Sequence, residues 1–191
     1  NAIKRAIGVL QSLDTSFSFG TCDGTKVYAS IPSETPLSSA ALLPSGITFV
    51  QVTQANLAKT DGTGWIPINF QAAASQGVSS PLGSLPIAPL NTHNSSNPAR
   101  SYFYTYACNL NRQYELNAKL ESNYFGFKDR DGFPINNPAT NDLPLRDGGD
   151  NGLYETGTNL TILPKGGQCP SGMVWVPAPG LFCIDAYEAT Y

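Results

Sequence analysis

Charged side chains are scarce in this sequence. Only 13% of its 191 residues are Asp, Glu, Lys or Arg, and 11 basic against 14 acidic residues give a formal net charge of -3. Proteins that bind nucleic acid or an anionic membrane surface carry basic patches or stripes, and the only adjacent basic pair here is Lys4-Arg5. We assign that pair to a solvated helix face. The composition therefore predicts no nucleic-acid partner.

Signatures of catalysis and of membrane insertion are also missing from the sequence. No apolar run approaches the roughly 18 residues of a membrane-spanning helix, and no segment has the pattern of a signal peptide. We find no Ser/His/Asp order, metal-binding helix, phosphate-binding loop or dinucleotide fingerprint, and the single histidine, His93, falls in a polar segment. We predict that the chain is not an enzyme and assign no catalytic residue.

The sequence does hold 18 glycines and 15 prolines, with Ser, Thr and Asn between them. This composition is typical of short strands joined by long, specified loops. The four cysteines contain no CxxC pair, which favours two disulfides over a zinc site and predicts an extracellular, cell-surface or periplasmic location. Proximity along the chain favours Cys22–Cys108 and Cys169–Cys183, although four cysteines permit three pairings.

Apolar residues at steps of three and four predict an amphipathic helix over residues 1–14. The helix lacks a capping pattern at its start, so we expect it to be the C-terminal part of a longer helix. Its apolar stripe consists of Ile3, Ala6, Ile7, Leu10 and Leu13.

Three segments further along the chain have the composition of strands. Residue alternation predicts strands at 26–31 and 47–52. At 65–70, Pro67 indicates either an edge strand or an irregular segment. Residues 71–100 are almost uncharged and rich in proline, and we expect them to form a long ordered connection across the sheet.

The strongest pattern is a hairpin over residues 101–122, SYFYTYACNLNRQYELNAKLES. Tyr102, Tyr104 and Tyr106 share one face of its first strand with Cys108. This face must pack against something apolar, and the helix is the obvious cover; a stripe of tyrosines that stacks on a ligand is the alternative. We predict an α+β fold in which the N-terminal helix packs on an antiparallel sheet, with a short C-terminal β appendage.

The order of these features resembles the globular part of bacterial type IV pilin-like proteins, the prepilin-type group that includes the major pseudopilins. Four pieces carry the resemblance: the helix, LPIAPLN at 85–91, the tyrosine-rich hairpin and the Gly/Asp-rich loop DGGDNGLYETG at 147–157. Ala88 stands where an aspartate is usual in the family, so any role of that carboxylate is lost here.

The resemblance covers residues 1–163 and implies a structural subunit of an extracellular filament, either a type IV pilus or a secretion pseudopilus. Such a subunit assembles with identical or related subunits through its N-terminal helix, and the expected packing residues are Ile3, Ala6, Ile7, Leu10 and Leu13. The resemblance also implies an apolar half-helix upstream of residue 1, through which alone we expect the chain to contact a membrane.

The final segment, CPSGMVWVPAPGLFCIDAYEATY at 169–191, follows a linker at 164–168 and resembles the start of a formylglycine-generating-enzyme, or sulfatase-modifying-factor, domain. That domain has a C-type-lectin-like fold, and residues 173–177 and 182–185 match its first two strands. Its catalytic cysteines match no residue of this chain, so the activity does not carry over. The resemblance implies an alternative function: a pilin-like stalk or minor tip subunit that displays a C-type-lectin-like domain for ligand binding or adhesion.

An acidic stretch between the hairpin and the final segment is the candidate ligand site. Carboxylates on a Gly/Asn-rich backbone suit calcium, and the resemblance agrees, because major pseudopilins have a calcium-binding loop near their C-terminus. The alternative is a set of Asp/Asn/Gly turns that needs no metal. Calcium is the only candidate cofactor, and its candidate ligands are Asp129, Asp131, Asp142, Asp147, Asp150 and Glu155.

Overall fold

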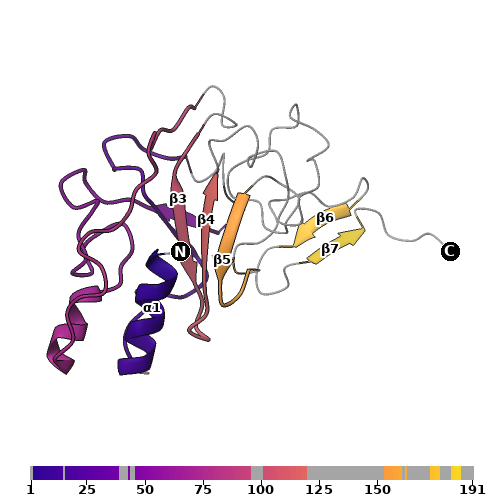
Figure 1. The fold of residues 1–191 in the computed structure, drawn as a ribbon. Coiled ribbons are helices and arrows are strands. Elements are labelled where there is room, and N and C mark those ends of the chain that lie inside the picture. The colour runs from indigo at the N-terminus through magenta and orange to yellow at the C-terminus, as the bar shows by residue number, and fades with distance from the viewer. Residues whose placement is uncertain are drawn as a thin grey trace.

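The computed structural model describes residues 2–14, 16–38, 43, 46–95, 101–119, 153–160, 162, 173–176 and 182–185. A five-stranded sheet and a helix that packs on it form an α+β fold (Figure 1). The elements of the described residues are α1 (Ala2–Leu13), β1 (Lys26–Ala29), β2 (Thr48–Val50), the 3-10 helix η1 (Phe70–Gln76), β3 (Tyr104–Cys108), β4 (Tyr114–Lys119), β5 (Leu153–Gly157), β6 (Met173–Val176) and β7 (Phe182–Asp185).

Helix α1 follows the predicted apolar stripe, which faces the core. Its buried residues are Ile3, Ala6, Ile7 and Leu10, and Leu13 packs against the same core with partial exposure. The helix ends where Asp14 turns the chain, because Asp14 Oδ1 accepts hydrogen bonds from the N (2.7 Å) and Oγ (2.6 Å) of Ser16. An aspartate that bonds the backbone two residues further on favours a turn over continued helix.

The five-stranded sheet has the order β2-β1-β3-β4-β5 and is mixed. β1 pairs in parallel with β2 and antiparallel with β3, and the remaining pairs are antiparallel. Our prediction of an antiparallel sheet was therefore wrong for β2. A parallel neighbour requires a crossover, so the chain between Ala29 and Thr48 must return to the end of the sheet at which β1 begins.

The predicted hairpin forms as β3 and β4, and β3 is the central strand of the sheet. Its register pairs Tyr106 with Leu116 and Cys108 with Tyr114, and these side chains share one buried cluster with the apolar stripe of α1. The helix is thus the cover of the tyrosine face, and the role of core packing is confirmed for Tyr106. Within the cluster the Tyr106 and Tyr114 rings stack with centroids 6.3 Å apart.

Residues 65–70 form an irregular segment rather than a strand, and they enter the same core. Trp65, Ile66, Ile68 and Phe70 are all buried. The segment leads into η1, which we did not predict and which packs beside α1 (Figure 1). Asn69 caps η1 because its side chain accepts a hydrogen bond from Gln71 N (3.0 Å).

The opposite face of the sheet is covered as well. Gln51 holds residues 31–37 in place through its side-chain amide. Its Oε1 accepts from Leu37 N (2.9 Å), and its Nε2 donates to the backbone carbonyls of Ile31, Pro32 and Thr35. Two small apolar clusters result: Val27, Leu43, Ala107 and Ile162 in one, and Ala29, Ile31, Leu37 and Phe103 in the other.

The C-terminal part of the chain differs from the prediction at one point. We assigned residues 147–157 to a loop, but Leu153–Gly157 form β5, which pairs with β4. β6 and β7 pair antiparallel in a sheet of their own, at the two segments for which strands were predicted. None of the helices in the described residues has the length and apolar character needed to cross a membrane.

Candidate functional site

The exposed side of α1 is the first candidate surface. We call it the outer helix face and define it by its exposed residues: Ala2, Lys4, Arg5, Gly8, Val9 and Ser12. A Cβ added at Gly8 would meet nothing within 4 Å, and Val9 is 37% exposed. This face is therefore open and carries a net positive charge.

The residues predicted to pack in a filament lie on the other side of α1. Ile3, Ala6, Ile7 and Leu10 are buried in the core of the chain itself. Any contact that α1 makes with another subunit must therefore use the outer helix face while the core stays intact. The packing of α1 in a filament stays a prediction.

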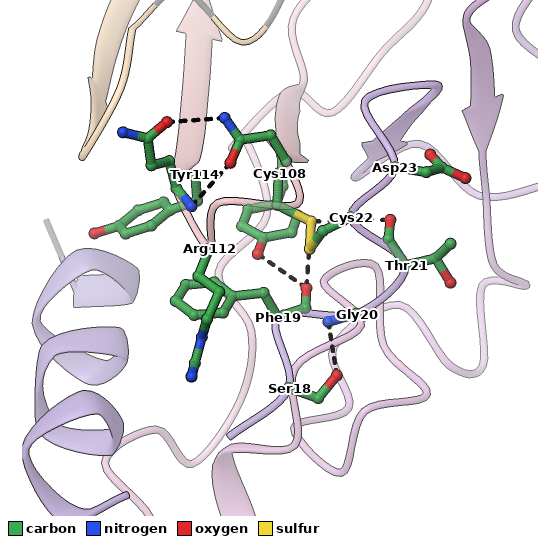
Figure 2. The surroundings of a disulfide bond; sticks show 12 residues. Ser18, Phe19, Gly20, Thr21, Cys22, Asp23, Cys108, Arg112 and Tyr114 are labelled. Atoms are coloured by element: carbon green, nitrogen blue, oxygen red, sulfur yellow. Dashed lines mark hydrogen bonds between the residues drawn. A yellow bond between two sulfur atoms is a disulfide. The ribbon is translucent and has the colours of Figure 1, made fainter. Parts of the chain in front are cut away.

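The predicted Cys22–Cys108 disulfide is confirmed, with a sequence separation of 86 residues. Figure 2 shows it between the segment that follows α1 and the end of β3. Beside it the buried Tyr106 hydroxyl donates to Phe19 O (3.0 Å). Two independent links therefore hold the chain after α1 against the tyrosine face.

Arg112 adds a third link at the same corner. Its guanidinium lies 5.5 Å from the Phe19 ring centroid (Figure 2). It also lies 5.8 Å from the Phe17 ring centroid, and Nη2 donates to Phe17 O (2.8 Å). Cation–π contacts of this kind stabilise by about 0.5–1 kcal/mol at exposed sites. Arg112 thus holds the hairpin against residues 17–19 of the same chain.

The tip of the hairpin is ordered by its own side chains. Asn109 Oδ1 accepts from Asn111 N (3.0 Å) and Gln113 N (3.1 Å), and Asn109 Nδ2 donates to Gln113 Oε1 (2.9 Å). Leu110, which is 83% exposed, is displayed at this tip. The tip therefore presents a large apolar side chain to solvent on a well-braced turn.

The 85–91 segment that carried part of the family resemblance has a structural role. Leu85 and Ala88 are buried, and Pro86 O accepts from Trp65 Nε1 (3.0 Å). Asn91 and Ser30 bond twice, because Asn91 Oδ1 accepts from Ser30 Oγ (2.9 Å) and Asn91 Nδ2 donates to Ser30 O (2.9 Å). The segment thereby fixes the end of β1.

A buried polar cluster lies on the sheet face opposite α1, and we name it the inner polar cluster: Thr105, Glu115 and Asn117. All three are nearly inaccessible to solvent. Glu115 Oε1 accepts from Asn117 Nδ2 (2.9 Å) and Glu115 Oε2 accepts from Ile162 N (3.0 Å). We did not predict this cluster, because alternating polar residues on a strand are equally typical of a solvated face.

The predicted calcium ligands fall largely outside the described residues: Asp129, Asp131, Asp142, Asp147 and Asp150. Glu155 lies in β5, opposite Asn117 in the register. Within the described part of the chain, no group of three or more His, Cys, Asp or Glu residues could hold a metal ion. The second predicted disulfide also stays a prediction, because Cys169 lies outside the described residues.

Burial and hydrogen bonding shift several pKa values. Burial lowers the pKa of His93, whose Nδ1 lies 3.1 Å from Ser101 Oγ. Burial raises the pKa of Tyr106 well above its usual value, and the neighbouring tyrosines act in the same direction. Hydrogen bonds from Thr25 and Thr63 lower the pKa values of Asp23 and Asp61 in two matching turns. These shifts follow from local packing and turn geometry.

No model of a known protein family matches the chain, and neither a curated protein sequence nor a solved structure is significantly similar to it.

Proposed function

We propose that the chain is the globular part of a structural subunit of a bacterial extracellular filament, of the type IV pilus or secretion pseudopilus kind. The observation that carries the proposal is the way in which the two sides of α1 are placed. One side of the helix is buried against the tyrosine face, and the outer helix face stays open. A helix held in this way keeps a surface for neighbouring subunits while its own domain is complete.

Two further features support the proposal. The disulfide and the Arg112 contacts brace the chain just after α1, so that load on the helix is passed to the hairpin. The order of helix, 85–91 segment and tyrosine-rich hairpin resembles pilin-like proteins, and each of these pieces has a defined place in the core. The proposed partners are therefore identical or related subunits.

A matched pair of substitutions tests the role of the outer helix face. Val9 on α1 and Val78 after η1 are both 37% exposed, so Glu at either position should have a similar small effect on folding. In cells that produce the native full-length protein, we expect Val9→Glu to abolish filaments and Val78→Glu to leave them. Filaments are counted by electron microscopy and by pelleting after shearing.

The outcomes separate the parts of the proposal. If the unaltered protein forms no filament in its native cells, the proposed function is wrong. If both variants assemble normally, the outer helix face is not the assembly surface. Urea unfolding of both variants controls for stability, since a shared loss of stability would reduce filaments in both.

A second candidate function rests on β6 and β7. These strands form an antiparallel pair separate from the five-stranded sheet, which supports a second structural unit after residue 163. In this alternative, the pilin-like part is a stalk or minor tip subunit that displays a C-type-lectin-like domain. Deletion of the chain from residue 169 onward should then leave assembly intact and abolish adhesion. Filaments of the deletion variant that adhere as well as those of the unaltered protein would contradict it.

A further inference from the structure

Buried polar side chains in the described part of the chain are bonded with two exceptions. Ser30 Oγ donates to Asn91, Thr60 Oγ1 accepts from Gln71, and Ser101 Oγ accepts from Asn94 N. By contrast, Thr105 Oγ1 and Asn117 Oδ1 have no hydrogen-bond partner among the residues described. Buried polar atoms in folded proteins are nearly always bonded, so these two require an explanation.

The two exceptions are neighbours. Thr105 on β3 lies directly opposite Asn117 on β4 in the register, so both side chains stand on the same face of the sheet. Cβ atoms of such pairs are about 4.5–5.5 Å apart. Their exposed fractions are 1% and 4%, which places both oxygens in the interior. One small guest can therefore contact both.

The hydrogen bond between Asn117 and Glu115 determines what the guest must be. Asn117 Nδ2 donates to Glu115 Oε1 (2.9 Å), which fixes the amide so that Oδ1 faces another direction. Oδ1 can only accept, whereas the Thr105 hydroxyl can donate or accept. A water molecule can donate to Oδ1 and bond the hydroxyl as well. Buried waters typically make about three hydrogen bonds to such groups.

A calcium ion fits the cluster less well. It takes about 6–8 oxygen ligands, whereas the cluster supplies one amide oxygen, one hydroxyl and a carboxylate, and Glu155, opposite Asn117 in the register, could add one further carboxylate at most. Both carboxylate oxygens of Glu115 already accept hydrogen bonds, from Asn117 Nδ2 and Ile162 N. Because both oxygens already accept hydrogen bonds, the cluster favours a neutral guest over a cation.

We propose that the inner polar cluster encloses a binding site for one water molecule, held by Thr105 Oγ1 and Asn117 Oδ1. The water completes a hydrogen-bond network that runs from β3 through Asn117 and Glu115 to the backbone of Ile162, 47 residues beyond Glu115. The network ties the segment after β5 to the central hairpin. This site is independent of whether the protein forms filaments.

A high-resolution crystal structure of the chain tests the site directly. We expect a solvent peak about 2.7–3.2 Å from both oxygens. Thr105→Val, which keeps the shape and removes the hydroxyl, should lose or displace the peak, and Thr105→Ser should retain it. A direct bond between the two oxygens, or a peak at about 2.3–2.6 Å with calcium-like coordination, would overturn the assignment.

The sign of a stability change provides a second test. If the water is present, Thr105→Val removes its anchor and shifts the urea midpoint to lower urea. If the hydroxyl is simply unsatisfied, replacing it with a methyl group removes an unfavourable buried polar group and shifts the midpoint to higher urea. An unchanged or raised midpoint therefore contradicts the proposal.

Discussion

Replacing Cys22 by alanine opens the disulfide that joins the chain after α1 to the end of β3. The sequence separation of 86 residues makes this a long closed loop. In the chain-entropy model, closing a loop of this length lowers the entropy of the unfolded chain enough to stabilise the fold by roughly 4–5 kcal/mol. We expect Cys22→Ala to lower the free energy of unfolding by about that amount, because Cys22 is only partly buried and its packing loss is small.

The assay is urea unfolding followed by circular dichroism. With a urea dependence of about 1–3 kcal/mol per M, the midpoint should move down by on the order of 2 M. The double variant Cys22→Ala/Cys108→Ala is the control, since it adds only the loss of one buried thiol, and peptide mapping checks that no new disulfide forms. A decrease below about 1 kcal/mol in the free energy of unfolding of Cys22→Ala would mean that the cross-link does not restrict the unfolded chain as expected.

Three further predictions concern single residues. Asn91→Ala removes two hydrogen bonds to the end of β1 and places alanine at a φ of 39°, so we expect a loss of about 1–3 kcal/mol in urea unfolding; no loss would contradict this role. Gly64→Ala puts a Cβ against Lys59 O and should destabilise strongly, whereas Gly83→Ala, with nothing within 4 Å, should be nearly neutral; equal effects would argue against the close approach. Because burial lowers the pKa of His93, the unfolded chain gains a proton at higher pH than the folded chain, so stability should fall as pH drops through about 6.5, and His93→Gln should remove that part of the fall.

The helix and the hairpin could be predicted because their periodicity reports directly on which side is buried. Apolar residues three and four apart define the buried stripe of α1, and alternation in 101–122 defines the tyrosine face. The Cys22–Cys108 pairing followed from proximity along the chain. The helix and the hairpin depend on residues that are near one another in the sequence, whereas the disulfide joins two consecutive cysteines that are 86 residues apart.

The parallel pairing of β2 and the existence of β5 could not be predicted in this way. Thr48–Val50 has the pattern of a short strand, but the pattern carries no information on direction. Leu153–Gly157 follows a run rich in Gly and Asp, which indicates a loop, and only pairing with β4 makes it a strand. Tertiary context decides such short segments.

The inner polar cluster was missed for a related reason. Glu115 and Asn117 alternate with Tyr114 and Leu116, a pattern that is also typical of one solvated face. What buries them is a cover from distant parts of the chain, with Ile162 bonded to Glu115. The predicted calcium ligands and the Cys169–Cys183 pairing stay predictions, since they depend on residues outside the described part of the chain.

Immunogold electron microscopy of cells that produce the native full-length protein shows whether the chain is part of a filament. Antibodies raised against the folded chain would mark the protein wherever it accumulates. We expect gold particles in rows along surface filaments, and purified filaments that contain this chain. Labelled protein found only as free monomers in the periplasm or the medium, with no filament, would contradict the proposal that it is a filament subunit.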